Sequence, residues 1–372
     1  MMNFSGGRPV RNRLRPGQRL TRAGRVCGAA LLLSGASAVA ASAASKVGWV
    51  WADQQDAVSA YTADPSYSYN SAAGAVSVTP QGLGSYQVTF TGLGSTLSDG
   101  VLVTAYDTNG YCTVAGWSSP AGGDVKANVT CFDAAGAAAN SKFSLVYQAH
   151  SGAIGDASRG TAFLWAEQPT SPSYEPASGY QYNSTGGSNT IVRNGVGSYT
   201  ASLPGLTKTG GHAQVAAFGD IAGRCKVESW GQDAEGTRVD VRCFSDEGHP
   251  ADRMFTLAYA RNLPLAFVTT GTTSGLYGWA SQPANDSYRL SGPYSFNSWG
   301  AGKLTAIQDG LGSYEVQADG VGSYSTSNVL VTAYGDKNTY CNVQSWFPAT
   351  VKCFRQGGTP INSRFDLSFQ AH

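Results

Sequence analysis

Short segments of alternating apolar and polar residues recur along the chain. Residues 86–90 read Tyr-Gln-Val-Thr-Phe, and residues 143–147 read Phe-Ser-Leu-Val-Tyr. A period of two places one set of side chains on a buried face and the other toward solvent or a second sheet, so each segment predicts a β-strand. Glycines, 47 in all, stand with Asn, Ser and Asp between these segments and supply turns. No long stretch shows helical spacing, which predicts an all-β fold.

The strand pattern occurs three times. Trp51, Trp165 and Trp279 stand 114 residues apart, and each heads the same landmarks. The landmarks are Trp-Ala, Tyr-x-aromatic-Asn-Ser, Gly-Ser-Tyr, an apolar strand, two cysteines and a closing aromatic strand. We predict three tandem antiparallel β-sandwich or small-barrel modules, at residues 44–150, 161–261 and 275–372, joined by linkers at residues 151–160 and 262–274. The linkers are rich in Gly, Ser, Thr and Ala, so we expect modules that fold separately and move somewhat relative to one another.

Residues 1–43 read as a secretory signal peptide. They carry seven arginines and no acid up to Arg25, an apolar run at residues 26–33, and small residues that suit cleavage after Ala40 or Ala43. An uncleaved anchor is the alternative, but the segment is rich in Ala, Ser and Gly, whereas a membrane span needs about 20 predominantly apolar residues. The protein is therefore expected to be extracellular, with no membrane span after cleavage.

Cleavage changes both the charge and the cysteine count. It removes seven of the 25 basic residues, which leaves 18 against 24 acidic residues and a net charge of about −6. An acidic surface repels phosphate backbones and anionic lipid, so nucleic acid is not an expected partner. Cleavage also removes Cys27, and an even count at matching positions in an exported chain predicts one disulfide per module. The alternative, a thiol or zinc site, lacks a Cys-x-x-Cys motif and a repeated histidine. The predicted pairs are Cys112 with Cys131, Cys225 with Cys243, and Cys341 with Cys353.

The sequence from residue 329 to 372 resembles a known module type. It contains an apolar strand, Tyr-Gly-Asp, a cysteine, Ser-Trp, Cys-Phe, Asn-Ser and a closing strand. This pattern, present in all three modules, is similar to a module found in tandem in uncharacterised secreted proteins of actinobacteria and related soil bacteria. That resemblance implies secretion but no catalytic residue or ligand. The strand order is more loosely similar to six-stranded H-type lectin sandwiches and to receptor-binding tips of phage fibres, and fold analogy alone does not imply function.

No module carries an evident catalytic constellation. A Ser-His-Asp site needs a histidine within hydrogen-bond reach of its nucleophile, and the repeated histidines at the ends of the first and third modules are interpreted as structural. The four histidines are His150, His212, His249 and His372. A glycoside hydrolase needs paired acids. Asp53 and Glu167 stand at matching positions of the first two modules, but the third module has Ser281 there. We therefore expect no enzyme, no cofactor and no metal site.

Two sets of residues are candidates for binding. Asp107, Asp220 and Asp336 each lie five residues before a first cysteine and are either Asx-turn formers or ligands for calcium or sugar hydroxyls. Asn70, Asn183 and Asn297, which stand at matching positions of the three modules, allow the same two interpretations. The aromatic candidates are Tyr67, Tyr69, Tyr180, Tyr182, Tyr294 and Trp299. They form either a strip on which sugar rings stack or an ordinary cross-strand ladder. Trp117, Trp230 and Trp346 are expected in the core beside the disulfides.

Two functions are consistent with these features. The first is a secreted non-catalytic protein whose modules each bind an extracellular polysaccharide or cell-surface glycan weakly, since repetition raises avidity without new contacts. The second is a structural or adhesive envelope protein in which the modules are spacers.

Overall fold

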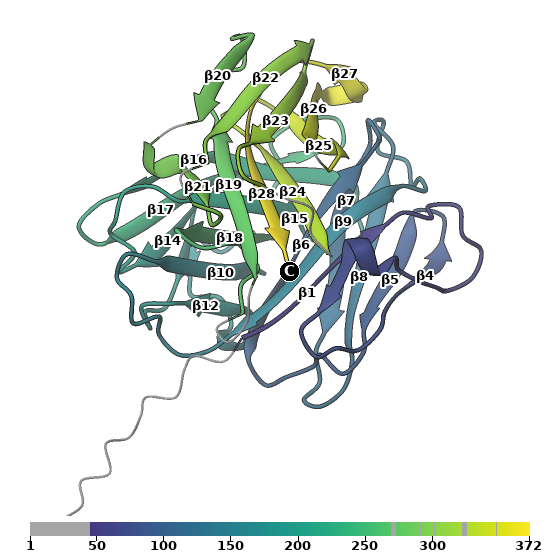
Figure 1. Cartoon of the computed structure of the whole chain (residues 1–372), viewed down its shortest axis with the longest axis horizontal. Coiled ribbons are helices and arrows are strands. Elements are labelled where there is room, and N and C mark those ends of the chain that lie inside the picture. The colour runs from purple at the N-terminus through teal and green to yellow at the C-terminus, as the bar shows by residue number, and fades with distance from the viewer. Residues whose placement is uncertain (1–44, 269–272, 291, 301, 322–325, 347) are drawn as a thin grey trace, which may run out of the picture. The chain divides into compact units, whose positions relative to one another are not determined.

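The computed structural model describes residues 45–372 except 269–272, 291, 301, 322–325 and 347. The expected signal peptide therefore lies outside the described residues. The described part is built from β-strands and four short 3-10 helices, which confirms the all-β prediction. We call residues 45–150, 160–261 and 274–372 the first, second and third repeats. Figure 1 shows them in purple to blue, in teal to green, and in green to yellow.

The strands fall at equivalent positions of the repeats. In the first repeat they are β1 (Ser45–Ala52), β2 (Tyr61–Thr62), η1 (Pro65–Tyr67), β3 (Ser68–Asn70), β4 (Val76–Gly82), β5 (Ser85–Phe90), β6 (Ser98–Tyr106), β7 (Tyr111–Ser118), β8 (Val125–Phe132) and β9 (Lys142–His150). In the second they are β10 (Gly160–Ala166), β11 (Ser173–Tyr174), η2 (Ser178–Tyr180), β12 (Gln181–Asn183), β13 (Thr190–Gly195), β14 (Ser198–Pro204), β15 (His212–Ala217), β16 (Gly223–Gln232), β17 (Gly236–Ser245) and β18 (Phe255–Arg261). In the third they are β19 (Ser274–Ala280), β20 (Ser287–Leu290), η3 (Gly292–Tyr294), β21 (Ser295–Asn297), β22 (Leu304–Gly310), β23 (Ser313–Ala318), β24 (Ser327–Tyr334), β25 (Tyr340–Ser345), β26 (Ala349–Arg355), η4 (Gln356–Gly358), β27 (Thr359–Pro360) and β28 (Arg364–Ala371).

Each repeat contributes two groups of hydrogen-bonded strands in the same order. One group has four strands, ordered β6-β9-β1-β3, β15-β18-β10-β12 and β24-β28-β19-β21. The other has five, ordered β2-β4-β5-β8-β7, β11-β13-β14-β17-β16 and β20-β22-β23-β26-β25. Within the five-stranded groups, Cys112 bonds Cys131, Cys225 bonds Cys243 and Cys341 bonds Cys353, and each bond joins directly opposed residues of two neighbouring strands. The predicted disulfides are confirmed.

The two groups of a repeat share a buried core. In the first repeat, Trp49 of β1 and Val88 of β5 are both fully buried in one apolar cluster. Alternation along β5 is as expected, with Tyr86, Val88 and Phe90 buried and the residues between them half-exposed. The same cluster extends to Phe163 of the second repeat. Burial of apolar surface therefore holds neighbouring repeats together as well as each repeat internally.

Strand pairing also crosses the repeat boundaries. β25 pairs parallel with β6 at Val343 and Tyr106, and β16 pairs parallel with β24 at Val227 and Tyr334. A parallel bridge between Val114 and Phe218 joins the first repeat to the second. The edge strand of each five-stranded group thus pairs with the apolar strand of another repeat, and the three pairings close a cycle. Each of these pairings joins one residue pair and so covers part of an edge that could otherwise pair with another chain.

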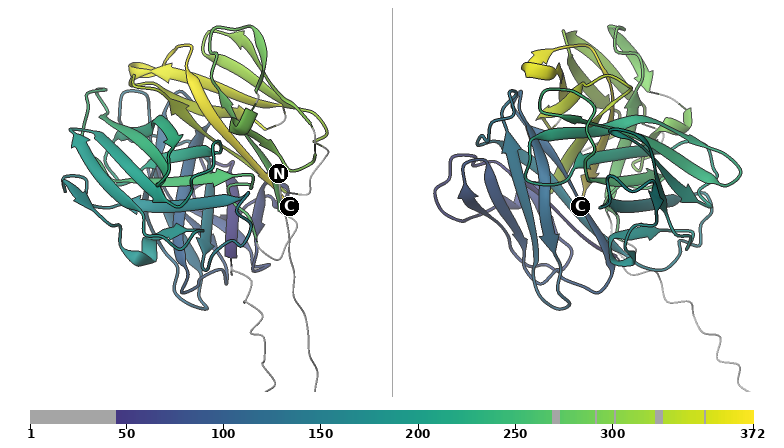
Figure 2. Two further views of the ribbon diagram at one scale, coloured as in Figure 1. Left: turned by 90° about the vertical axis from the view of Figure 1, so that its left-hand side faces the viewer. Right: turned by 180° about the vertical axis from the view of Figure 1, so that it is seen from behind.

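The expectation of separately moving modules is therefore wrong. β6, β15 and β24 contact one another pairwise, and the repeats stay side by side around these strands in the views of Figures 1 and 2. The Thr104 hydroxyl of β6 donates to the Val331 carbonyl of β24 at 3.1 Å. Linker composition was misleading because it does not show whether the repeats that a linker joins are buried against each other.

Candidate functional site

The most regular feature of the molecule is a group of four aromatic rings at each junction between repeats, which we call a junction cluster. Each contains the Trp of the opening strand, the Tyr of the 3-10 helix, the aromatic residue that ends the apolar strand, and the Trp that follows a first cysteine of another repeat. The clusters are Trp51, Tyr67, Tyr106 and Trp346; Trp165, Tyr180, Phe218 and Trp117; and Trp279, Tyr294, Tyr334 and Trp230.

Most ring pairs in a cluster meet tilted or edge to face, and Tyr67 and Trp346 are stacked. Trp165 lies 4.7 Å from Phe218 between ring centroids, and Tyr180 meets Trp117 at 5.5 Å with the planes 85° apart. Such tilted arrangements are the favoured geometry of aromatic pairs. Most of the rings, including Tyr180, are half-buried, so each cluster presents part of its surface to solvent.

The Trp after each first cysteine reaches across the junction because its strand is bulged. The register of β7 against β8 shifts between Val114 and Gly116, immediately before Trp117. The same shift occurs in β16 and in β25. A bulge re-aims the next side chain, so these Trp rings contact another repeat, a role that the sequence pattern did not predict.

Asp99 fixes one of these rings. The Trp117 indole N–H donates to its carboxylate at 2.8 Å, and the hydroxyls of Ser119 and Tyr147 donate to it as well. Burial raises the pKa of Asp99, while these hydrogen bonds oppose the shift. The carboxylate is fully engaged in positioning, and sequence reasoning missed it because this acid occurs in the first repeat alone.

The predicted aromatic strip divides into two environments. Tyr67, Tyr180 and Tyr294 belong to the junction clusters. Tyr69 and Tyr182 instead lie opposite Trp49 and Phe163 in register, as a cross-strand ladder would place them. Trp299 lies 6.0 Å from Phe369 within the third repeat. Three of the six candidates therefore lie in the junction clusters, and the other three lie outside them.

The three candidate aspartates are not structurally equivalent. Asp107 directly follows the end of β6 and has a left-handed φ of 52°, where the other repeats have Gly219 and Gly335. Its backbone N–H, like those of the two glycines, donates across a junction. Asp220 and Asp336 lie one residue further from the strand. Counting back from the cysteine aligned the three because the first loop is one residue shorter.

None of these aspartates joins a ligand cluster in the described residues. The Asp107 carboxylate lies 3.3 Å from the Lys142 ammonium, and Asp220 and Asp336 are exposed. No group of three or more His, Cys, Asp or Glu side chains in the described part of the chain could hold a metal ion. The asparagines are turn formers: the side-chain oxygens of Asn70, Asn183 and Asn297 each accept an N–H from two residues ahead.

Two histidines are completely buried at junctions. His150 stacks on Phe267 at 4.6 Å, and His212 stacks on Tyr277 of the third repeat at 4.3 Å. Burial lowers the pKa of each imidazole to about 3, so both are neutral at physiological pH. His212 Nδ1 lies 3.9 Å from an oxygen of Asp366, whose carboxyl pKa is raised by burial.

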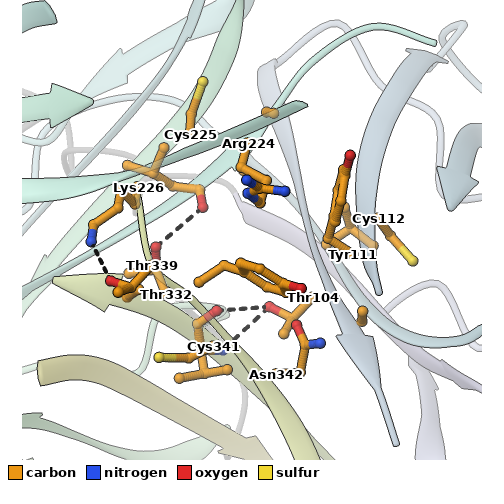
Figure 3. A pocket seen from close by; sticks show the side chains of 18 of the residues that line it. Thr104, Tyr111, Cys112, Arg224, Cys225, Lys226, Thr332, Thr339, Cys341 and Asn342 are labelled. Atoms are coloured by element: carbon orange, nitrogen blue, oxygen red, sulfur yellow. Dashed lines mark hydrogen bonds between the residues drawn. The ribbon is translucent and has the colours of Figure 1, made fainter. Parts of the chain in front are cut away.

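A cavity of about 50 Å³ lies among β6, β15 and β24, lined by residues of all three repeats. In Figure 3, Arg224 and Lys226 of the second repeat face Tyr111 of the first and Thr339 of the third. The Arg224 guanidinium lies 4.8 Å and 4.7 Å from the ring centroids of Tyr111 and Tyr340. The Lys226 ammonium donates to Thr339 Oγ1 at 2.7 Å, and burial lowers its pKa to about 7. The two cationic side chains that line the cavity, Arg224 and Lys226, therefore contact the other two repeats and help to hold the three repeats together.

Searches against protein-family models, curated proteins and solved structures found no match to this chain. Among the described residues, no helix has the length and apolar character needed to cross a membrane. The three disulfides fit an oxidising environment such as the outside of the cell.

Proposed function

We propose that the chain is a secreted, non-catalytic protein of three β-sandwich modules that binds an extracellular polysaccharide or cell-surface glycan through three weak sites, one at each junction cluster. The observation that carries the proposal is the recurrence of four aromatic rings, most of them half-buried, at equivalent places in all three junctions. Aromatic faces accept the apolar faces of sugar rings, and a half-buried ring is held rigidly at little further entropic cost.

The cyclic pairing of the repeats supports a multivalent mode of binding. It fixes the distances between the three clusters, and a fixed array engages a repetitive polymer without the ordering cost of flexible linkers. A structural or adhesive envelope protein is the second candidate, and the strand pairing at the junctions between repeats favours it. In that case the junction clusters are adhesive packing between repeats and have no ligand.

Retention of the mature chain, residues 44–372, on insoluble chitin, cellulose and peptidoglycan separates the two candidates. Tyr67→Ala, Tyr180→Ala and Tyr294→Ala are introduced singly, in pairs and together. Under the proposal retention falls steeply with each site lost, because avidity multiplies weak affinities. Tyr174→Ala is the matched control, since Tyr174 is also half-buried but lies outside the junction cluster and accepts a hydrogen bond from Gln168. No retention of the wild-type chain on any polymer, or equal losses for Tyr180→Ala and Tyr174→Ala, would refute the proposal.

A further inference from the structure

The second repeat contains a pocket of about 250 Å³ that none of the junction rings lines. Its walls are the segment 153–159 before β10, the turn after β12, the segment 205–208 after β14, and the end of β18. Its volume is close to the lower end of the roughly 300–1,000 Å³ range of small-molecule sites. It therefore suits a ligand about as large as a single sugar or a comparable small molecule.

The charged side chains that line this pocket are all basic. They are Arg159, Lys208 and Arg261, and no Asp or Glu is among the lining residues. Arg261 is fixed by hydrogen bonds from its guanidinium to the carbonyls of Thr209 and Ser158. Asp156, which does not line the pocket, pairs with Arg159 at 3.5 Å and also attracts Arg261, so it offsets part of this positive charge. A concentration of positive charge on a chain whose mature form is acidic favours a negatively charged ligand.

The remaining walls supply an apolar surface and a fixed cover. Leu206 is 7% exposed and forms part of the floor, with Ile154 beside it. The covering segment is held in place because the Ile154 N–H donates to the Ser184 carbonyl at 3.0 Å. Asn262 Nδ2 donates to the Ser158 carbonyl at 2.8 Å and holds the other end of the segment. The pocket is thus preorganised, which lowers the cost of binding.

The first repeat shows why the pocket exists in the second. Lys46 of β1 pairs with Ala149, and at the same positions of the second repeat Gly160 pairs with Arg261. In the first repeat the Lys46 side chain crosses this space and donates to the Gly94 carbonyl at 2.8 Å. In the second repeat the positive charge has moved to the neighbouring strand, and Gly160 leaves the space open. A Cβ built on Gly160 would lie 2.8 Å from Leu206 Cδ2.

We propose that this pocket binds a small organic anion, whose carboxylate or phosphate group lies among Arg159, Lys208 and Arg261 and whose carbon skeleton rests on Leu206. Ionised acceptors make the strongest hydrogen bonds with guanidinium and ammonium groups, and Arg suits both carboxylate and phosphate. The proposal goes beyond the junction sites, because it concerns one pocket in one repeat and a ligand selected by charge.

Isothermal titration of the mature chain tests the proposal with four probes that differ in charge and in carbon skeleton. Galacturonate carries a carboxylate, glucose 6-phosphate carries a phosphate, inorganic phosphate lacks the carbon skeleton, and glucose lacks the charge. We expect one of the two sugar anions to bind with a stoichiometry of one, more tightly than inorganic phosphate, and with an affinity that falls as salt is added. Glucose binding as tightly as both anions, or no binding of either anion, overturns the proposal.

Two variants locate the site. Lys208→Gln should weaken anion binding by about 10-fold or more, the loss expected for one charge-assisted contact. The Lys208 side chain is exposed and makes no hydrogen bond or ion pair with other described residues, so the fold should not suffer. Gly160→Lys copies the first repeat and should abolish binding by filling the pocket. Lys126→Gln, which removes an exposed lysine of β8, is the control. Equal effects of Lys208→Gln and Lys126→Gln overturn the proposal.

The outcome is separable from that of the proposed glycan sites. Tyr180→Ala should leave anion affinity unchanged, and Lys208→Gln should leave retention on polysaccharide unchanged. Polymer retention without anion binding refutes the pocket alone, and anion binding without polymer retention refutes the junction sites alone.

Discussion

Removing one ring of a junction cluster should lower the stability of two repeats that are distant in sequence. Trp346 lies in the third repeat, is 9% exposed, and contacts three rings of the first repeat. Truncation of a buried Trp to Ala costs about 3–5 kcal/mol, from lost transfer free energy and the cavity left behind. The aromatic pairing energies are part of this loss and are not added to it. Trp346→Ala should therefore raise the population of states open at this junction by at least roughly 100-fold.

Amide hydrogen exchange followed by mass spectrometry measures where the loss is felt. We expect faster exchange in the third repeat and also in β6 of the first repeat, including the Asp107 amide, which donates to the Val343 carbonyl at 2.8 Å. Protection reports local opening free energy, so a shared opening unit loses protection on both sides of the junction. Trp299→Ala removes the same residue type within the third repeat, where the ring packs near Phe369, and should affect that repeat alone.

Unchanged exchange in the first repeat of Trp346→Ala would refute this reasoning. It would mean that the contacts of Trp346 with the first repeat do not couple the opening of the two repeats.

Three further predictions follow from single sites. Gly84→Ala should lower the thermal stability far more than Gly92→Ala. Both residues have φ near +68°, where a Cβ costs about 1–2 kcal/mol. Only at Gly84 does the new Cβ also lie 2.5 Å from a backbone carbonyl oxygen. Asp107→Gly should cost less than about 0.5 kcal/mol in denaturant unfolding, because glycine relieves the left-handed backbone; Asp133→Gly, which removes an acceptor of two backbone N–H groups, should cost more. Burial lowers the pKa of His150 to about 3. Below about pH 6.5 the imidazole is therefore protonated in the unfolded chain but stays neutral in the folded chain. The free energy of unfolding should fall by up to about 1.4 kcal/mol per pH unit from pH 6.5 down to pH 3. The wild type should therefore lose more stability on acidification than His150→Phe, and parallel pH profiles would contradict this.

The sequence predicted the features that depend on local spacing. Alternation located the strands, and the two cysteines of each repeat stood at positions that face each other on adjacent strands. The shorter hairpin of the third repeat also fits, since β25 ends at Ser345 and β26 begins at Ala349, whereas Ser118 and Val125 bound the longer tip in the first repeat. A deletion at a hairpin tip leaves the paired residues unchanged.

The features that sequence spacing could not predict are those between repeats. Val343 and Tyr106 pair across more than two hundred residues, and no periodicity marks which edge strand meets which. The aspartate alignment failed for a related reason: counting from the cysteine ignored a one-residue difference in the loop. Counting instead from the aromatic residue that ends the apolar strand would have placed Asp107 with Gly219 and Gly335 and pointed to a backbone requirement rather than to a ligand.

The differences between repeats at the central cavity give a physical reason for joining the three repeats in one chain. Tyr111, Arg224 and Tyr340 each precede a first cysteine, and they meet as one cation between two aromatic faces. A symmetric trimer of identical modules would place the same residue at all three positions, and three arginines there would combine the desolvation of three charges with their mutual repulsion. Three tyrosines would instead leave the aromatic faces without a cation. A single chain allows each position to differ. The buried contact between His212 and Asp366 at one junction is a second difference of this kind.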